Sequence, residues 1–180
     1  QHCGEHILSF VCWKLFDSNN IGFHMNEDTV TVDLDKALSE EELLQVEQES
    51  NAIIWENRPI TVLNLESEEA AKLPMRKFNA NLQGILRIVA VENADVCTCC
   101  GTHPPVTGMV GCLKIMRAER RKQGQRLEIL CGARAMAEYA KQNRILRDLA
   151  TDLSAKVDEV PERYAKIKEE MANLNEALKE

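Results

Sequence analysis

The chain has 180 residues, of which 44% are hydrophobic and 4% aromatic, enough apolar material for one domain with an appendage. Its 29 acidic residues outnumber the 22 lysines and arginines, and the net charge of −7 excludes a general binder of polyanions. No apolar run approaches the roughly 20 residues of a membrane helix, and no export signal is visible. We therefore expect a cytoplasmic protein without a membrane partner.

The seven cysteines are odd in number and irregularly spaced, which argues against a disulfide framework. Without an export signal, reduced thiols are the better interpretation. Most of these cysteines are expected to be small buried residues.

The first half of the chain predicts helices and strands in alternation. An apolar repeat at helical spacing predicts a helix over residues 2–15. Alternating β-branched residues predict a strand over 29–34. A serine followed by three glutamates begins a second helix, expected over 39–56. A strand over 60–65 and a short helix over 67–73 follow.

The second half predicts three more strands, over residues 86–91, 110–116 and 126–131, the last two joined by a turn around Gly124. Strands and helices are mixed without regular βαβ alternation. We therefore expect an α+β fold, with helices packed on one face of a largely antiparallel sheet.

A locally basic stretch interrupts this acidic chain. Residues 114–126 contain six lysines and arginines against a single acidic residue, Glu119. A solvated turn and a local phosphate contact both explain such a run. The candidate residues for nucleic-acid binding are Arg117, Arg120, Arg121, Lys122 and Arg126.

The tail has a different pattern. From Met136 to Leu178, apolar residues recur in alternating steps of three and four, as in the seam of a coiled coil, with the polar Asn143 at one seam position. Pro161 either kinks one long helix or lies in the first turn of a second one. A helix docked on its own domain is the alternative, but we favour an intermolecular coiled coil or helical hairpin, and hence a homodimer.

We accordingly expect two domains, residues 1–133 and residues 134–180, with Gly132 at the boundary. The chain opens on Gln1 and carries a candidate metal motif already at residue 2. A helix that carries such a motif normally has a cap and a preceding turn. We therefore expect a piece of a longer chain, with protein missing upstream.

Two short motifs carry the candidate chemistry. His2 and His6 form an H-x-x-x-H pair, which a helix places on one face, one turn apart. Cys99 and His103 form a C-x-x-x-H pair in a loop. Each motif alone is usually a surface or core pair, but together three imidazoles and one thiolate would fill a tetrahedral zinc shell.

A second interpretation of the cysteines stays open. Cys97 and Cys100 form a C-x-x-C pair, which suits zinc binding or redox chemistry. This alternative leaves three histidines at ligand spacing unexplained, so we favour the first set.

Four sequence elements occur in an order that resembles a known family. They are the H-x-x-x-H pair at 2–6, the alternating strand at 29–34, the string N-x-I-I-x-x-N-x-P at 51–59, and the string C-x-G-T-H-x-x-x-T-G-x-x-G at 99–111. Together they resemble the editing domain of alanyl-tRNA synthetases and the freestanding AlaX-type alanyl-tRNA editing proteins, over roughly residues 1–134.

The resemblance implies a zinc-dependent hydrolase that cleaves a wrong amino acid, mainly serine with glycine as a second candidate, from the 3′ end of the alanine tRNA. By motif position it assigns His2, His6, Cys99 and His103 as zinc ligands. Two alternatives stay open. One is a non-catalytic module in which zinc only stabilises a tRNA-binding or dimerising fold, and the other is the editing segment of a complete alanyl-tRNA synthetase.

Asn20 and His24 are the candidate catalytic residues that the resemblance implies. Alignment through Gly22 places on Asn20 a polar position that helps synthetase editing domains to hold the substrate. Archaeal freestanding editors use a threonine to select serine, and the matching residue here is Ile21, which cannot form a side-chain hydrogen bond. Selectivity would then rest elsewhere, with His24 as the candidate and a purely structural His24 as the alternative.

Overall fold

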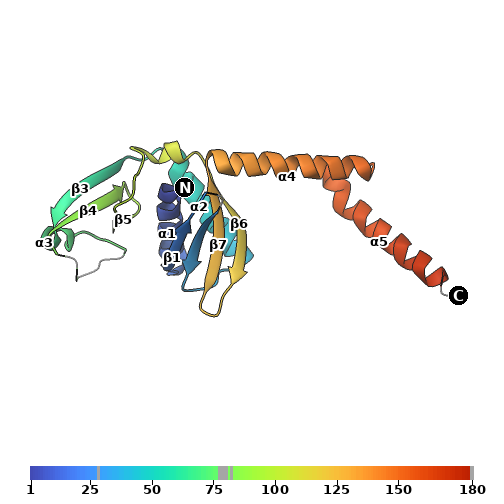
Figure 1. Ribbon diagram of the computed structural model, residues 1–180, viewed down its shortest axis with the longest axis horizontal. Coiled ribbons are helices and arrows are strands. Elements are labelled where there is room, and N and C mark those ends of the chain that lie inside the picture. The colour runs from blue at the N-terminus through green and yellow to red at the C-terminus, as the bar shows by residue number, and fades with distance from the viewer. Residues whose placement is uncertain (28, 77–80, 82, 179–180) are drawn as a thin grey trace. The chain divides into compact units, whose positions relative to one another are not determined.

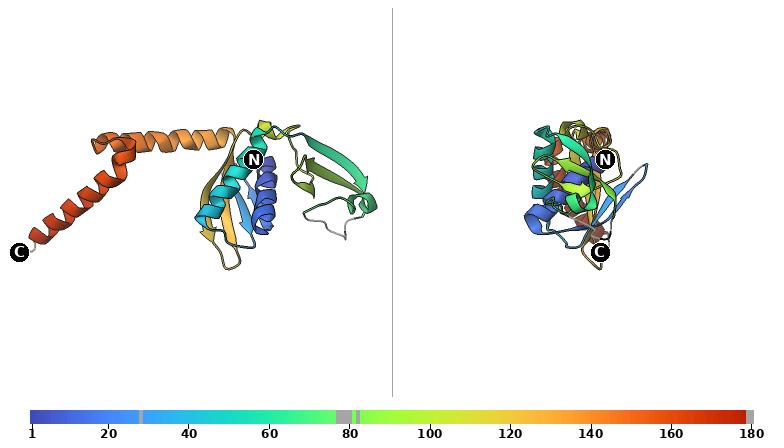
Figure 2. Two further views of the ribbon diagram at one scale, coloured as in Figure 1. Left: turned by 180° about the vertical axis from the view of Figure 1, so that it is seen from behind. Right: turned by 90° about the vertical axis from the view of Figure 1, so that its left-hand side faces the viewer.

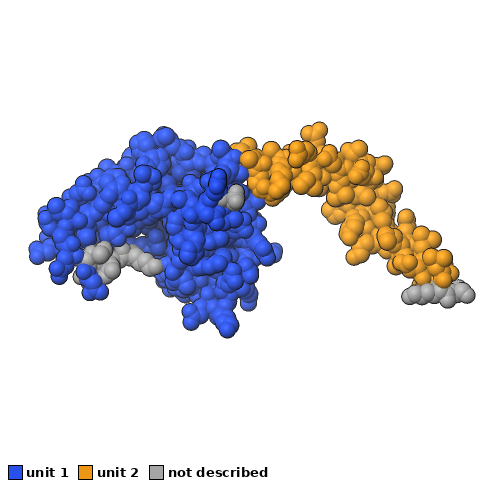
Figure 3. All heavy atoms as spheres, in the orientation of Figure 1, with its two compact units in different colours: residues 1–135 blue, residues 136–180 orange. Residues whose placement is uncertain are grey.

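The computed structural model of the chain describes residues 1–27, 29–76, 81 and 83–178. The chain forms two compact units, residues 1–135 and residues 136–180 (Figure 3). No helix in the described ranges is long and apolar enough to cross a membrane. The boundary between the units lies close to residue 133, but the division into two functional domains stays a prediction.

Unit 1 contains two long helices, α1 (His2–Phe16) and α2 (Glu40–Trp55), a short helix α3 (Ser67–Ala70) and a 3-10 turn η1 (Thr107–Val110). The two long helices expected from the sequence are thereby confirmed. α2 begins in a capping box: Ser39 Oγ accepts the Glu42 N–H, and the Glu42 carboxylate accepts the Ser39 N–H. α3 ends at Ala70, earlier than expected.

The strands of unit 1 form two antiparallel sheets (Figure 1). The first sheet has the order β1-β2-β7-β6 and consists of β1 (Asn20–Met25), β2 (Val30–Leu34), β6 (Leu113–Arg120) and β7 (Gln125–Cys131). The second has the order β3-β4-β5 and consists of β3 (Ile60–Glu66), β4 (Ile85–Val91) and β5 (Val96–Thr98). The α+β class with antiparallel pairing is confirmed.

Three strands differ from the sequence-based expectation. β1 was not predicted, although Ile21, Phe23 and Met25 alternate in the segment NIGFHM, and β5 was missed because it has only 3 residues. β6 begins at Leu113 rather than at residue 110, because Val110 still lies in η1, which Gly111 terminates with a φ of 83°. Pairing with β7 then continues to Arg120, beyond the expected end at residue 116.

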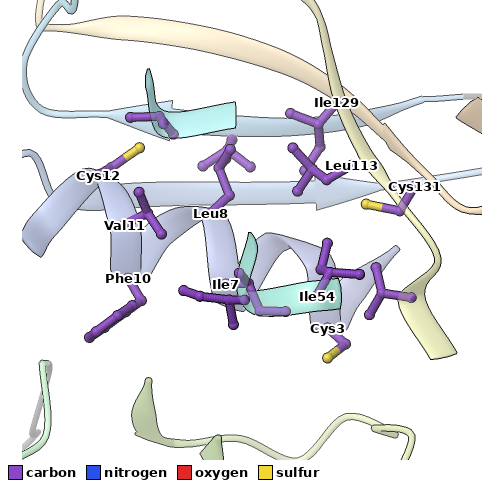
Figure 4. Close-up of a cluster of buried hydrophobic side chains, with 14 of the residues drawn as sticks. Cys3, Ile7, Leu8, Phe10, Val11, Cys12, Ile54, Leu113, Ile129 and Cys131 are labelled. Atoms are coloured by element: carbon purple, nitrogen blue, oxygen red, sulfur yellow. The ribbon is translucent and has the colours of Figure 1, made fainter. Parts of the chain in front are cut away.

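The main core lies between the two long helices and the four-stranded sheet. α1 and α2 pack side by side on one face of this sheet, as Figure 1 and the side view in Figure 2 show. Leu8 of α1 packs in this core together with Leu113 and Ile129 of the sheet (Figure 4). Each such fully buried side chain stabilises the fold by roughly 1.5–3 kcal/mol.

α1 is buried on every side over residues 3–12. Because the helix is surrounded over this range, its polar residues lie in the interior together with its apolar ones. These are Glu5, His6 and Ser9. Buried polar side chains require hydrogen-bond or metal partners, which makes this face of α1 a candidate site.

The tail is not one continuous helix. It consists of α4 (Ala133–Asp152), a 3-10 turn η2 (Val157–Glu159) and α5 (Val160–Ala177). Pro161 lies in the first turn of α5, so the second of the two expectations for this proline is confirmed. The apolar seam is interrupted in the structure, because the seam residues Leu153 and Val157 lie in the connection between the helices.

Candidate metal centre

Four side chains from two distant parts of the chain converge in unit 1. His2 and His6 lie one turn apart on α1, whereas Cys99 and His103 lie in the loop between β5 and η1. One nitrogen or sulfur atom from each residue lies within 4.8 Å of the other three. The structure thus brings together the four residues that the motif spacing singles out.

Three of the six separations between these atoms match the edges of a zinc tetrahedron, and the others lie within 4.8 Å. His2 Nε2 lies 3.2 Å from His6 Nε2 and 3.5 Å from Cys99 Sγ. His103 Nε2 lies 3.4 Å from the same sulfur. Usual zinc–ligand bond lengths place two tetrahedral nitrogens about 3.3 Å apart, and a nitrogen and a sulfur about 3.6 Å apart. The donor set and its spacing therefore fit zinc.

The loop that carries Cys99 approaches α1 closely at Gly101. A Cβ atom on Gly101 would collide with the His2 imidazole, so a side chain here would force the ring or the loop to move. The Gly101 N–H donates to Cys99 Sγ at 3.3 Å, and Arg87 of β4 donates to the carbonyl oxygens of Cys99 and Gly101. The loop is therefore held in place by its own backbone and by the second sheet.

Burial and hydrogen bonding shift the protonation of His2, His103 and Cys99 toward the forms that bind a metal, whereas His6 shifts the other way. Burial lowers the pKa of His2 and lowers that of His103 to about 4, and the neighbouring His6 acts in the same direction on both. Burial acts to raise the pKa of Cys99, but hydrogen bonds from His6 and the Gly101 N–H outweigh it and lower that pKa. Neutral imidazoles and a thiolate are the forms that bind a metal.

A buried ion pair lies behind His6. Asp95, in the turn between β4 and β5, accepts a hydrogen bond from His6 Nδ1 at 3.0 Å and one from Arg76 Nε at 3.2 Å. The Asp95 and Arg76 side chains are only 1% and 7% exposed. When Nδ1 donates to a carboxylate, the lone pair of Nε2 is directed at a metal, an arrangement typical of zinc-binding histidines.

The same contacts shift the protonation of the pair. Burial disfavours the charged form of His6, but the hydrogen bonds to Asp95 and to Cys97 outweigh it and raise the pKa of His6 to about 12. Burial likewise acts to raise the pKa of Asp95, and the contacts with His6 and Arg76 hold it below its usual value. Asp95 therefore stays an anion at neutral pH, and His6 pairs with it as a cation, which must release its Nε2 proton when a metal ion binds.

The sequence did not predict Asp95 or Arg76 as part of the site. β5 is too short to be seen in the pattern, so the turn that holds Asp95 was not recognised. The available signal was the string Glu-Asn-Ala-Asp at residues 92–95, a polar turn directly after a strong strand.

Cys97 forms a second group with His6 and Asp95. Its sulfur lies 3.1 Å from His6 Nδ1, and all three residues are buried. Burial raises the pKa of Cys97, so its thiolate forms less readily than that of Cys99. Cys100 is exposed, and neither group of potential ligands in the described residues includes it.

The two candidate catalytic residues lie in different places. Asn20 is directed toward α1, where its Nδ2 donates to Glu5 Oε1 and to Ser9 Oγ. His24 is exposed and pairs with Thr31, on the face of the sheet opposite to the neighbouring Phe23, which stacks on His2. The structure does not bring His24 to the four-residue cluster, and the catalytic role of both residues stays a prediction.

The basic residues lie on the hairpin formed by β6 and β7. Arg126 is paired with Asp33 at 2.7 Å, and Arg121 with Glu119 at 3.2 Å. The Arg126 guanidinium lowers the pKa of Asp33. The other three candidates, Arg117, Arg120 and Lys122, are exposed. Acidic neighbours thus partly neutralise the patch, and its role in nucleic-acid binding stays a prediction.

Comparison with known proteins shows to which family the chain belongs. Residues 86–128 match the family model described as the second additional domain of threonyl- and alanyl-tRNA synthetases. The chain is 31% identical over 177 residues to the alanyl-tRNA editing protein AlaX-L of Pyrococcus horikoshii, which covers 97% of this chain and 43% of that protein. The chain belongs to the alanyl-tRNA synthetase editing-domain family.

Complete synthetases contain the same segment. The chain is 30% identical over 170 residues to the alanine–tRNA ligase of Pyrococcus abyssi, covering 90% of this chain and 19% of the ligase. It is 30% identical over 186 residues to the ligase of Prochlorococcus marinus, covering 99% of this chain and 21% of that ligase. This editing-family chain therefore spans less than half the length of the curated relatives named here.

Proposed function

We propose that this chain hydrolyses the ester of mischarged alanine tRNA, releasing serine, with glycine as a second candidate, from the 3′ terminal adenosine. The observation that carries the proposal is the convergence of His2, His6, Cys99 and His103 at zinc-binding separations. Membership of the editing family, and the likeness to a relative named as an alanyl-tRNA editing protein, support the choice of substrate.

In this proposal His2, His6, Cys99 and His103 hold one zinc ion. Because four protein ligands fill a tetrahedral shell, a bound ion would need a fifth position to polarise a substrate oxygen or to activate a water molecule, and would otherwise orient the substrate by its charge. The chain's own residues fix the ligands beforehand: Asp95 orients His6, and Phe23 stacks on His2 with ring centroids 5.6 Å apart. Such preorganisation places the reacting groups without rearrangement when the ester arrives.

The proposed partner is the acceptor end of the tRNA, held partly by the β6–β7 hairpin. Among the exposed cations of that hairpin, Arg117, Arg120 and Lys122 form no ion pair with a described residue, on a chain with a net charge of −7. Few phosphate contacts give weak binding that falls steeply with salt. We therefore expect the 180-residue chain to have a high KM for tRNA.

The test is the release of serine from seryl-tRNA(Ala) by the purified chain, with alanyl-tRNA(Ala) as the comparison substrate. We expect hydrolysis of the seryl ester above the spontaneous rate, a decline in this rate with added salt, and a return to the spontaneous rate in His6→Ala. The variant His24→Ala makes the same change away from the cluster, and an unchanged rate would remove His24 from the catalytic site.

A zinc-loaded chain that leaves the seryl ester at its spontaneous rate would contradict the hydrolase. The non-catalytic module would then be the better explanation, with zinc stabilising the contact between α1 and the Cys99 loop. The likeness to alanine–tRNA ligases favours a third arrangement, in which the same site edits within a complete synthetase. The chemistry is the same in that arrangement, and only the attachment of the site differs.

We further propose that the tail pairs two copies of the chain. Both helices expose large apolar residues in the absence of a partner, namely Met136, Tyr139, Leu146 and Leu149 on α4 and Tyr164, Met171 and Leu174 on α5. An exposed apolar seam on a helix is stabilised by burial against a second helix.

Truncation after Arg134 tests this dimer. The full chain is expected to sediment as a dimer and the truncated chain as a monomer, because the seam residues lie beyond position 134. Sedimentation equilibrium at several concentrations measures both. Monomeric behaviour of the full chain would contradict the pairing.

A further inference from the structure

A buried carboxylate on α1 has no role in the proposal so far. Glu5 is 5% exposed, and its Oε1 accepts hydrogen bonds from Ser9 Oγ at 2.6 Å and from Asn20 Nδ2. Both donors are neutral. A carboxylate that is withdrawn from water is unfavourable unless an opposite charge lies against it.

The second carboxylate oxygen of Glu5, Oε2, has neither a hydrogen bond nor an ion pair with any described residue. Among the described residues, the side-chain atoms that are both sealed and unpartnered are Ser50 Oγ and His103 Nδ1. Oε2 is not one of them, so this oxygen is unpartnered among the described residues and keeps some contact with solvent.

Glu5 lies beside the candidate metal centre. It follows His2 by three residues on α1, a spacing that makes the two side chains neighbours, with Cβ atoms about 5–6 Å apart. β1 contacts both residues from the same side, because Phe23 stacks on His2 and Asn20 bonds to Glu5. The charge of Glu5 also acts on the His2 imidazole. Glu5 thus borders the edge of the centre that faces β1.

We propose that Glu5 binds the α-ammonium group of the aminoacyl ester, and so recognises the amino acid by its free amine. This assignment rests on the proposed hydrolase function. An α-amino group with a pKa of about 8 is largely protonated at neutral pH. It is attached to the carbon next to the ester carbonyl, so an anion beside the metal centre can hold the amine while the carbonyl faces the centre. Charge-assisted hydrogen bonds of this kind are short and strong.

Ser9 and Asn20 make this contact directional. Because both donate to Oε1, the carboxylate is fixed and Oε2 alone is offered to the substrate. The amine is common to seryl, glycyl and alanyl esters. Glu5 therefore orients the ester and selects free aminoacyl groups over blocked ones, but it does not distinguish serine from alanine.

The test compares seryl-tRNA(Ala) with N-acetyl-seryl-tRNA(Ala), whose amine is an uncharged amide. The unchanged chain should prefer the free amine by about 10- to 100-fold in kcat/KM, the effect of one hydrogen bond between charged groups. Glu5→Gln keeps the size of the side chain and an oxygen for Ser9 and Asn20. It should lower kcat/KM for the free amine by a similar factor and leave the acetylated ester unchanged. Glu49→Gln, an exposed glutamate on α2, is the matched control and should change neither.

Equal losses on both esters, or loss of zinc from Glu5→Gln, would overturn the assignment, because Glu5 would then support the fold or the ligands.

Binding of an uncleavable amide analogue, 3′-serylamino-3′-deoxyadenosine, and of its N-acetyl form supplies a calorimetric readout that needs no hydrolysis. A preference for the free amine that disappears in Glu5→Gln supports the assignment even if no ester is cleaved, and in that case the hydrolase proposal alone fails. Cleavage with an unchanged preference in Glu5→Gln overturns the assignment alone.

Discussion

A chain in which Cys99 and His103 are both replaced by alanine is expected to purify without zinc, whereas the unchanged chain carries about one ion per molecule. The double variant keeps only His2 and His6 of the cluster, and two imidazoles do not fill a tetrahedral shell. Elemental analysis of both proteins, purified without chelators, measures the difference. Cys100→Ala, at the exposed neighbouring cysteine, is the control and should retain its zinc.

The loss of zinc should also reduce stability. The two pairs of ligands belong to α1 and to the loop after β5, so a bound ion links the beginning of the chain to a segment about a hundred residues later. At zinc concentrations a hundredfold above Kd, binding to the native state contributes about 2.7 kcal/mol. The double variant should lack this contribution, and a chelator should remove it from the unchanged chain.

An unchanged zinc content in the double variant would contradict the first prediction. It would place the metal at His6, Asp95 and Cys97, or at Cys97 and Cys100.

The sequence could predict that these four residues converge because spacing restricts where they lie. Two histidines four apart on a helix share a face, and the Gly101-Thr102 step before His103 marks a loop. What spacing could not supply is the environment of those side chains. Asp95 lies in the turn before the short strand β5, and Arg76 lies in the segment between α3 and β4. Glu5 was hidden because a glutamate in a helix is ordinarily a solvent-exposed residue.

The fold shows the same division between local and long-range information. α1 and α2 follow from helical periodicity and from the Ser39 cap, both of which are local signals. The partition of the strands into two sheets depends on pairing between distant segments, such as β2 and β7, which a single sequence does not encode in its local pattern. β1 pairs with the next strand, β2, and its alternating apolar residues were a local signal that was missed. The tail seam is regular in sequence, yet residues 153–159 leave the helix, because Pro161 requires a new helix start.

Asp95→Asn is expected to destabilise the chain and to weaken zinc binding at the same time. The amide keeps the size of the side chain but removes the charge that faces Arg76 in the interior. Removal of one partner of a buried ion pair costs about 3–5 kcal/mol, because the other charge stays buried and unpaired. Loss of the carboxylate behind a metal-binding histidine typically lowers metal affinity by about 10- to 100-fold.

Two measurements separate these effects. Urea unfolding in the presence of a chelator reports the ion pair alone, and competition with a chromogenic chelator reports zinc affinity. Asp33→Asn is the matched control, because Asp33 also pairs with an arginine, Arg126, but on a partly exposed surface. That variant should change zinc affinity little, since Asp33 contacts no residue of the cluster in the described chain. If Asp95→Asn bound zinc as tightly as the unchanged chain, Asp95 would act on the fold alone, and the orientation of His6 would have to come from Cys97.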